Sequence, residues 1–191
     1  MPDDWVTIVS GLPRSGTSLM MQMLQAGGMK LLTDERRAAD QNNPRGYFEY
    51  EAVKRSGTDV SWLGLAGGRV VKVIHLLLRH LPADRPYRVI FMQRPLPEVL
   101  RSQDEMLRRR GNAESNIDTS AIGEAFQRHL IEINQWLAGK FNMEVSRVHY
   151  HRVLREPKPV SEELAAFLKT GLDIAAMVQQ VDGSLYRNRM K

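Results

Sequence analysis

The chain has 191 residues, 42% hydrophobic and 26% charged, with a formal net charge of +5, the composition of a soluble globular protein whose length favours one domain over residues 1–191. It contains no cysteine, which excludes disulfides, thiol nucleophiles and cysteine-ligated metals, and no apolar run of the roughly 18 residues that cross a bilayer. Because it opens with Met-Pro-Asp-Asp rather than a basic and apolar leader, we expect a cytoplasmic protein without a membrane partner.

The first predicted strand, residues 5–10, runs into a glycine-bounded loop that opens a predicted helix over residues 17–26. Gly11 and Gly16 are separated by four residues and followed by two hydroxyl residues. Backbone N–H groups in such a loop can surround a phosphate-sized anion at the helix N-terminus. The sequence therefore predicts an anion-binding loop at the end of the first strand.

This loop differs from that of nucleoside triphosphatases, which carry a lysine after the second glycine and an acidic strand end for magnesium. Thr17 stands at the lysine position, and the nearest cation is Arg14 inside the loop. We therefore expect no metal, and an anion held by N–H groups, by the hydroxyls of Ser15, Thr17 and Ser18, and by Arg14. A sulfuryl group fits such a site, because it carries less charge than a phosphoryl group.

Further strands and helices alternate along the rest of the chain. The polar, turn-rich segment 33–50 is predicted to be a loop over the mouth of the site. Strands are predicted at residues 29–32, 70–74, 88–92 and 148–153, and helices from Pro95-Leu96-Pro97 to Arg110, over 119–139, and from Ser161-Glu162-Glu163 to 168–171. The alternation predicts a three-layer α/β/α fold with a central parallel sheet of about four or five strands and a ligand site at their carboxyl ends.

Residues 11–18, GLPRSGTS, resemble the 5′-phosphosulfate-binding loop of sulfotransferases that use 3′-phosphoadenosine 5′-phosphosulfate. Arg94, at a strand end, and Ser102, eight residues later, resemble that family's 3′-phosphate-binding strand and helix. Residues 43–49, 148–168 and 185–189 are similar to bacterial-type members, so the resemblance covers most of the chain. It implies a P-loop NTPase-like fold and the donor-binding residues Pro13, Arg14, Ser15, Gly16, Thr17, Ser18, Arg94 and Ser102.

The resemblance leaves the closure of the 3′-phosphate site open. The chain lacks a counterpart of the glycine- and lysine-rich loop near the C-terminus of cytosolic members. Arg187 or Arg189 could replace it, and the alternative is a solvated basic tail.

Two cations are predicted to take part in the transfer. Arg14 is predicted to stabilise the leaving phosphate. Lys72 interrupts an otherwise apolar strand, where a charge is costly unless it meets a partner or ligand. Its place resembles the family's catalytic lysine, which implies a contact with the sulfuryl or bridging oxygen.

The catalytic base is predicted to be a carboxylate. Glu35, in the segment Asp34-Glu35-Arg36-Arg37, has about the place of the acidic segment of tyrosylprotein sulfotransferases, where a glutamate is the proposed base. Glu49 is the second candidate, and the alternative for both is an exposed ion pair. Cytosolic members have a histidine base two residues after the family's catalytic lysine. His75 lies three residues after Lys72, which would point it to the opposite side of a strand, so it is a weaker base candidate, and the alternative is a residue at a helix start.

A metal site is not expected. His149 and His151 would share a strand face, but no third ligand is evident, so we interpret them as structural.

These features predict a sulfotransferase that leaves adenosine 3′,5′-bisphosphate as product. The acceptor, a small molecule or polymer with a hydroxyl or amine, and the oligomeric state do not follow from the sequence. The first alternative is a P-loop nucleotide kinase or NTPase. The second is a non-catalytic binder of an anion or nucleic acid, although the basic runs at 36–37 and 108–110 lack the interleaved aromatics of a nucleic-acid platform.

Overall fold

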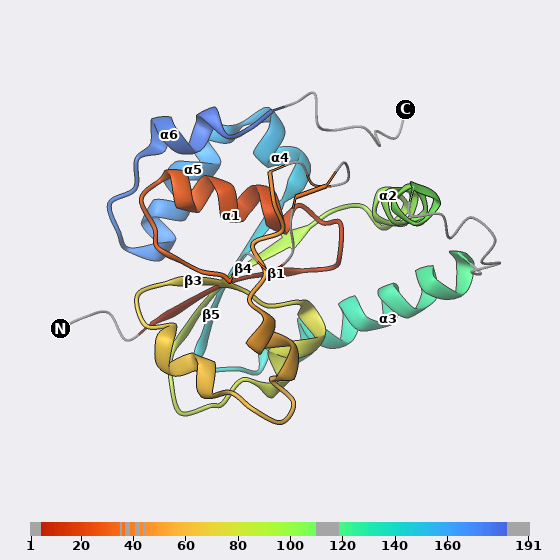
Figure 1. The fold of residues 1–191 in the computed structure, drawn as a ribbon, viewed down its shortest axis with the longest axis horizontal. Helices are drawn as coiled ribbons and strands as arrows, with labels where there is room; N and C mark the ends of the chain where they lie inside the picture. Colours follow the sequence, from red (N-terminus) through yellow and green to blue (C-terminus); the bar gives the residue numbers. More distant parts are fainter. Residues whose placement is uncertain are drawn as a thin grey trace.

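The computed structural model describes residues 5–34, 36, 39–40, 43, 45–109 and 119–182. Within these residues a five-stranded sheet has the order β2-β3-β1-β4-β5, and every neighbouring pair is parallel (Figure 1). The strands are β1 (Val6–Gly11), β2 (Leu31–Leu32), β3 (Val70–Lys72), β4 (Tyr87–Gln93) and β5 (Met143–His149).

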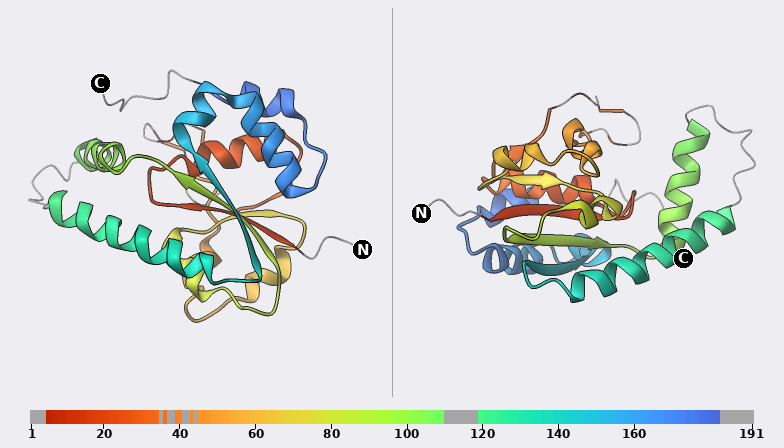
Figure 2. Two further views of the ribbon diagram at one scale, coloured as in Figure 1. Left: turned by 180° about the vertical axis from the view of Figure 1, so that it is seen from behind. Right: turned by 90° about the horizontal axis from the view of Figure 1, so that it is seen from below.

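Helices cover both faces of the sheet, which gives three layers (Figures 1 and 2). The α-helices are α1 (Thr17–Ala26), α2 (Leu96–Arg109), α3 (Thr119–Ala138), α4 (Tyr150–Arg155), α5 (Pro157–Leu168) and α6 (Ile174–Gln179). Three 3₁₀ helices, η1 (Glu51–Arg55), η2 (Ser61–Leu65) and η3 (His75–His80), lie on the α3 face, opposite α1, α5 and α6.

The core consists of two clusters, one on each face of the sheet. Along β4, Val89 and Phe91 belong to the cluster on the α3 face, whereas Ile90 and Met92 belong to the cluster beneath α1 and α5. Alternate residues of a strand point to opposite faces, so a strand buried on both sides needs a continuous apolar run. The predicted α/β class with a parallel sheet is confirmed.

The predicted strand over 148–153 is wrong. β5 covers Met143–His149, in register with β4 from Tyr87 to Gln93, and α4 begins at Tyr150. The strand lies at the edge of the sheet and carries Glu144 and Arg147, so it has no continuous apolar run that would indicate its bounds.

The predicted helix start at Ser161 is also wrong. α5 begins at Pro157, whose fixed backbone suits the first helical position. Ser161 is buried one turn later, and its Oγ donates a hydrogen bond to the Pro157 carbonyl over 2.7 Å instead of capping the helix. α6 was not predicted.

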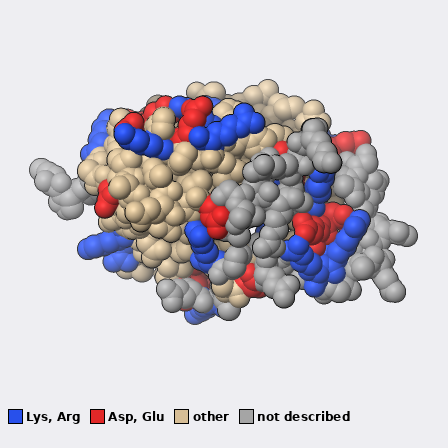
Figure 3. Space-filling model, turned by 90° about the horizontal axis from the view of Figure 1, so that it is seen from above, with Lys and Arg blue, Asp and Glu red and all other residues tan. Residues whose placement is uncertain are grey.

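Described acidic and basic side chains lie close together on one face of the molecule (Figure 3). On the face seen in Figure 3, red and blue atoms lie next to one another. Arg152 on α4 pairs with Glu156, which precedes α5, and with Glu163 on α5. No helix among the described residues is long and apolar enough to cross a membrane.

Candidate functional site

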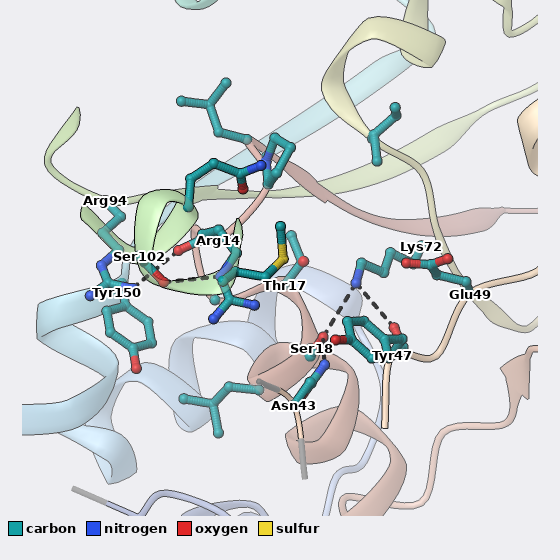
Figure 4. Close-up of a pocket in the computed structure, with 18 of the residues that line it drawn as sticks. Arg14, Thr17, Ser18, Asn43, Tyr47, Glu49, Lys72, Arg94, Ser102 and Tyr150 are labelled. Atoms are coloured by element: carbon teal, nitrogen blue, oxygen red, sulfur yellow. Dashed lines mark hydrogen bonds between the residues drawn. The ribbon is translucent and has the colours of Figure 1, made fainter. Parts of the chain in front are cut away.

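A cavity of about 580 Å³ opens at the carboxyl ends of the central strands. Its lining comes from the loop between β1 and α1, from Lys72 at the end of β3, from Arg94 after β4, and from Tyr150 after β5 (Figure 4). In parallel sheets this edge collects the loops that bind ligands. The structure thus brings the predicted loop and the predicted cations Arg14, Lys72 and Arg94 to one cavity.

The loop before α1 is tightly wound. Gly16, with φ of 100°, and Arg14, with φ of 68°, are both left-handed. An added Cβ at Gly16 would lie 2.4 Å from Cδ2 of Tyr150. α1 has no side-chain cap and no acidic residue in its first turn, so its N-terminal N–H groups and positive dipole end remain available to an anion.

Replacing Gly16 by alanine is expected to destabilise the protein more than the same change at Gly28. Both glycines have φ of 100°, so an alanine is strained at either position. An added Cβ at Gly28 has nothing within 4 Å, whereas at Gly16 it meets Tyr150. We expect Gly16→Ala to lower the free energy of unfolding in urea by about 2 kcal/mol more than Gly28→Ala. Equal losses would show that the contact with Tyr150 does not constrain the loop.

Arg14 connects the loop to α2. Its Nε donates a hydrogen bond to Oγ of Ser102 over 2.9 Å, and Ser102 is buried. Burial lowers the pKa of Arg14 from its usual value, because the guanidinium has lost part of its hydration. A partly desolvated cation in a cavity wall gains from binding an anion.

Arg94 is held from three sides. Its Nε donates to the Glu98 carboxylate over 3.0 Å, its Nη1 donates to the Arg14 carbonyl over 3.1 Å, and its guanidinium lies 4.7 Å from the Tyr150 ring centroid. Glu98 is 1% exposed, and its Oε2 also lies 2.9 Å from Nε2 of His151. Arg14, Arg94 and Ser102 therefore meet in one network at one end of the cavity (Figure 4).

Lys72 marks the other end of the cavity. Its Nζ donates to the Tyr47 carbonyl over 3.0 Å and to Oγ of Ser18 over 3.3 Å. Ser18 Oγ also accepts a hydrogen bond from Nδ2 of Asn43 over 2.7 Å. Because a hydroxyl has two acceptor sites and one hydrogen, Ser18 can donate that hydrogen to a ligand.

The structure describes one of the two predicted bases. Glu49 lines the cavity, and its Oε2 lies 3.8 Å from Nζ of Lys54, which is closer to Glu51 at 2.7 Å. Glu35 lies outside the described residues. Its neighbour Asp34 accepts the backbone N–H of Glu51 over 2.7 Å and so anchors the loop.

His75 is not placed as a base. Ile74 lines the cavity, whereas the neighbouring His75 is not among the described lining residues. His75 begins η3, is 2% exposed, and its ring centroid lies 5.7 Å from that of His129 on α3.

His75 is expected to make the stability depend on pH. Its burial lowers its pKa to about 4, with repulsion from His129 as the second cause, whereas an unfolded chain has a histidine pKa of about 6.5. The unfolded state then binds more protons between these values, so the free energy of unfolding falls as the pH falls through this window, by about 2 kcal/mol from pH 7 to pH 5.

Urea denaturation over this range checks that expectation. His75→Leu should remove most of the pH dependence, and His80→Leu, at an exposed position of the same helix, should leave it in place. If the free energy of unfolding of His75→Leu still falls with pH as in the unchanged protein, groups other than His75 cause the pH dependence.

The remaining predicted residues fall into four groups. Pro13, Gly16 and Thr17 line the cavity, whereas the Ser15 side chain is buried beneath the loop and does not appear in the described lining. His149 and His151 do not share a strand face, because β5 ends at His149; within the described part of the chain no three metal-binding side chains gather. Arg187 lies outside the described residues.

Tyr150 and Glu98 belong to the site but were not predicted from the sequence. Tyr150 follows β5 at the edge where ligands bind, and a correct strand end would have indicated it. Glu98 does not appear in the described lining, but it pairs with Arg94, four residues earlier, which is a detectable ion-pair spacing. Asn43 and Tyr47 belong to the segment 33–50 that was predicted to lie over the mouth of the site, and both line the cavity.

No family model matches the sequence, and no curated protein matches it. Solved structures do match. Mouse sulfotransferase SULT7A1, complexed with PAP, has a TM-score of 0.58 at 13% identity, over 98% of this chain and 67% of that one. Sulfotransferase STF9 from Mycobacterium avium has a TM-score of 0.59 at 13% identity, over 100% and 70%.

The sulfotransferase domain from the curacin biosynthetic pathway matches with a TM-score of 0.51 at 13% identity, over 95% of this chain and 79% of that one. The three matches extend over nearly the whole chain. The chain therefore has the sulfotransferase fold, and the predicted resemblance is confirmed at the level of the fold.

Proposed function

We propose that the chain is a sulfotransferase that uses 3′-phosphoadenosine 5′-phosphosulfate as donor and leaves adenosine 3′,5′-bisphosphate (PAP). One observation carries the proposal: Arg14, Lys72, Arg94 and Ser102, from three distant segments, line one cavity at the N-terminus of α1 in a sulfotransferase fold. The mouse neighbour solved with PAP supports the choice of nucleotide.

The donor groups of the cavity fit such a nucleotide. The N–H groups of the loop, Arg14 and the Ser18 hydroxyl would hold the phosphosulfate end, and Arg94 with Ser102 would hold the 3′-phosphate. The two sets are joined by the hydrogen bond from Arg14 to Ser102. When bound, the donor supplies an activated sulfuryl group.

The chain's own residues would assist the transfer in three ways. Arg14 and Lys72, which both line the cavity, would stabilise the bridging oxygen, which leaves with its electron pair on PAP. The acceptor oxygen forms the new bond to sulfur as the bond from sulfur to the bridging oxygen breaks. A carboxylate takes the acceptor's proton; Glu49 is the candidate in the described lining, and Glu35 is the other.

Two other functions stay as alternatives. A kinase or NTPase would need an acidic magnesium ligand, and the described strands around the loop end in Gly11, Lys72, Gln93 and His149. A nucleic-acid binder would need a basic face, and on the face drawn in Figure 3 the described acidic side chains lie beside the basic ones.

Calorimetry in EDTA tests the proposal. PAP should bind with a dissociation constant on the order of micromolar, without magnesium. Absence of PAP binding, together with magnesium-dependent turnover of ATP, would favour the kinase instead. Steeply salt-dependent binding to DNA or RNA, with no preference for PAP, would favour the nucleic-acid binder.

A further inference from the structure

The cavity has chemically different ends. Arg94, Ser102 and Tyr150 lie at one end, and Lys72, Tyr47 and Glu49 lie at the other (Figure 4). Beyond Lys72 and Glu49 the chain continues into five apolar or aromatic residues that also line the cavity, which we call the apolar wall: Tyr50, Val53, Val73, Ile74 and Leu77.

The apolar wall is continuous with the hydrophobic core. Val53 and Val73 are buried members of the core cluster on the α3 face, and Tyr50 and Leu77 pack against that cluster. Ile74 is 41% exposed at the start of η3. The buried valines therefore back the wall, and Tyr50, Ile74 and Leu77 leave the apolar surface that a ligand can remove from water.

The charged groups beside the wall are already paired with one another. Nζ of Lys54 lies 2.7 Å from Glu51 and 3.8 Å from Glu49. An anionic acceptor would have to compete with these carboxylates. A sugar would place several hydroxyls against aliphatic side chains, and each hydroxyl that loses water without gaining a partner costs binding free energy.

From this arrangement, and resting on the proposed function, we infer that the acceptor is an uncharged, largely apolar alcohol or phenol. Its apolar body packs on the wall, and its hydroxyl lies toward Lys72 and Glu49. The same wall disfavours carbohydrate acceptors and acceptors with a carboxylate or phosphate group.

Transfer from a radiolabelled donor tests the inference with four probes: 2-naphthol and cyclohexanol as apolar acceptors, glucose as a carbohydrate, and 4-hydroxybenzoate as an anionic phenol. We expect kcat/KM for 2-naphthol to exceed that for glucose and for 4-hydroxybenzoate by about 100-fold. Faster transfer to glucose or to 4-hydroxybenzoate would overturn the inference.

Two matched variants test whether the apolar wall binds the acceptor. Ile74→Asn should lower kcat/KM for 2-naphthol about tenfold and leave the affinity for PAP unchanged. Leu76→Asn is the control, because Leu76 is similarly exposed, at 47%, lies in the adjoining η3 and does not appear in the described lining. It should change kcat/KM by less than about twofold. If the two variants lower kcat/KM equally, the apolar wall does not bind the acceptor.

The outcomes separate this inference from the function on which it rests. If PAP binds but neither 2-naphthol nor cyclohexanol is sulfated, the acceptor class is wrong and the donor assignment stands. If PAP does not bind at all, the proposed function fails, and the inference fails with it.

Discussion

Arg94→Ala is expected to weaken PAP binding by about 100-fold. The guanidinium is anchored by Glu98, by the Arg14 carbonyl and by the Tyr150 ring, so it is fixed in place before a ligand arrives. A preorganised charged hydrogen bond to phosphate is worth about 1.5–3 kcal/mol, and the loss of the charge adds to this. Calorimetry with PAP measures the effect.

Adenosine 5′-monophosphate is the matched control ligand, since it lacks the 3′-phosphate. Its affinity should fall by less than about threefold in Arg94→Ala, because the loop that holds the 5′-phosphate is retained. A ratio of the two affinities also corrects for any misfolded fraction. If both ligands lose affinity equally, Arg94 does not bind the 3′-phosphate.

Glu98→Ala is expected to lower the free energy of unfolding by about 3–5 kcal/mol. Glu98 is 1% exposed and lies 3.0 Å from Arg94, whose side chain is 8% exposed, so its removal leaves a buried cation without its carboxylate. Removing one partner of a buried pair costs this much, because the remaining charge stays desolvated. Urea denaturation provides the measurement.

Asp104→Ala is the control on the same helix. Asp104 pairs with Arg108 at 2.8 Å with the same spacing of four residues, but the two side chains are 45% and 72% exposed. An exposed pair contributes at most about 1 kcal/mol, so this variant should be nearly neutral. Similar losses for Glu98→Ala and Asp104→Ala would contradict the account of Arg94 as a buried, anchored cation.

The sequence predicted the site best where a short local pattern determines the backbone geometry. The two glycines around Arg14 allow the left-handed backbone of the loop, and the helix at 17–26 follows directly from it. Arg94 and Ser102 could be placed together because a strand end and two helical turns fix their separation.

Contacts between distant segments could not be predicted in this way. Tyr150 packs against Gly16 and lies beneath Arg94, and His151 reaches Glu98, 53 residues away. These partners depend on where β5 ends, and the edge strand has too few apolar residues to reveal its bounds. The predicted shared face of His149 and His151 failed for the same reason.

The valines at the acceptor end of the cavity could not be predicted from the sequence as lining residues either. Val53 and Val73 read as ordinary core residues, and they are buried, yet they also form part of the cavity lining. Val73 follows Lys72 in the sequence, whereas Val53 reaches this end of the cavity through the fold of the segment after Glu49. A hydrophobic pattern does not distinguish a core residue from one that also lines a binding cavity.

A crystal structure of the chain grown with PAP in EDTA tests the central claim most directly. The account predicts the 5′-phosphate against the backbone N–H groups of the loop and Arg14, and the 3′-phosphate against Arg94 and Ser102, with no metal ion between them. A nucleotide bound elsewhere, or bound in the cavity only when magnesium is added, would contradict it.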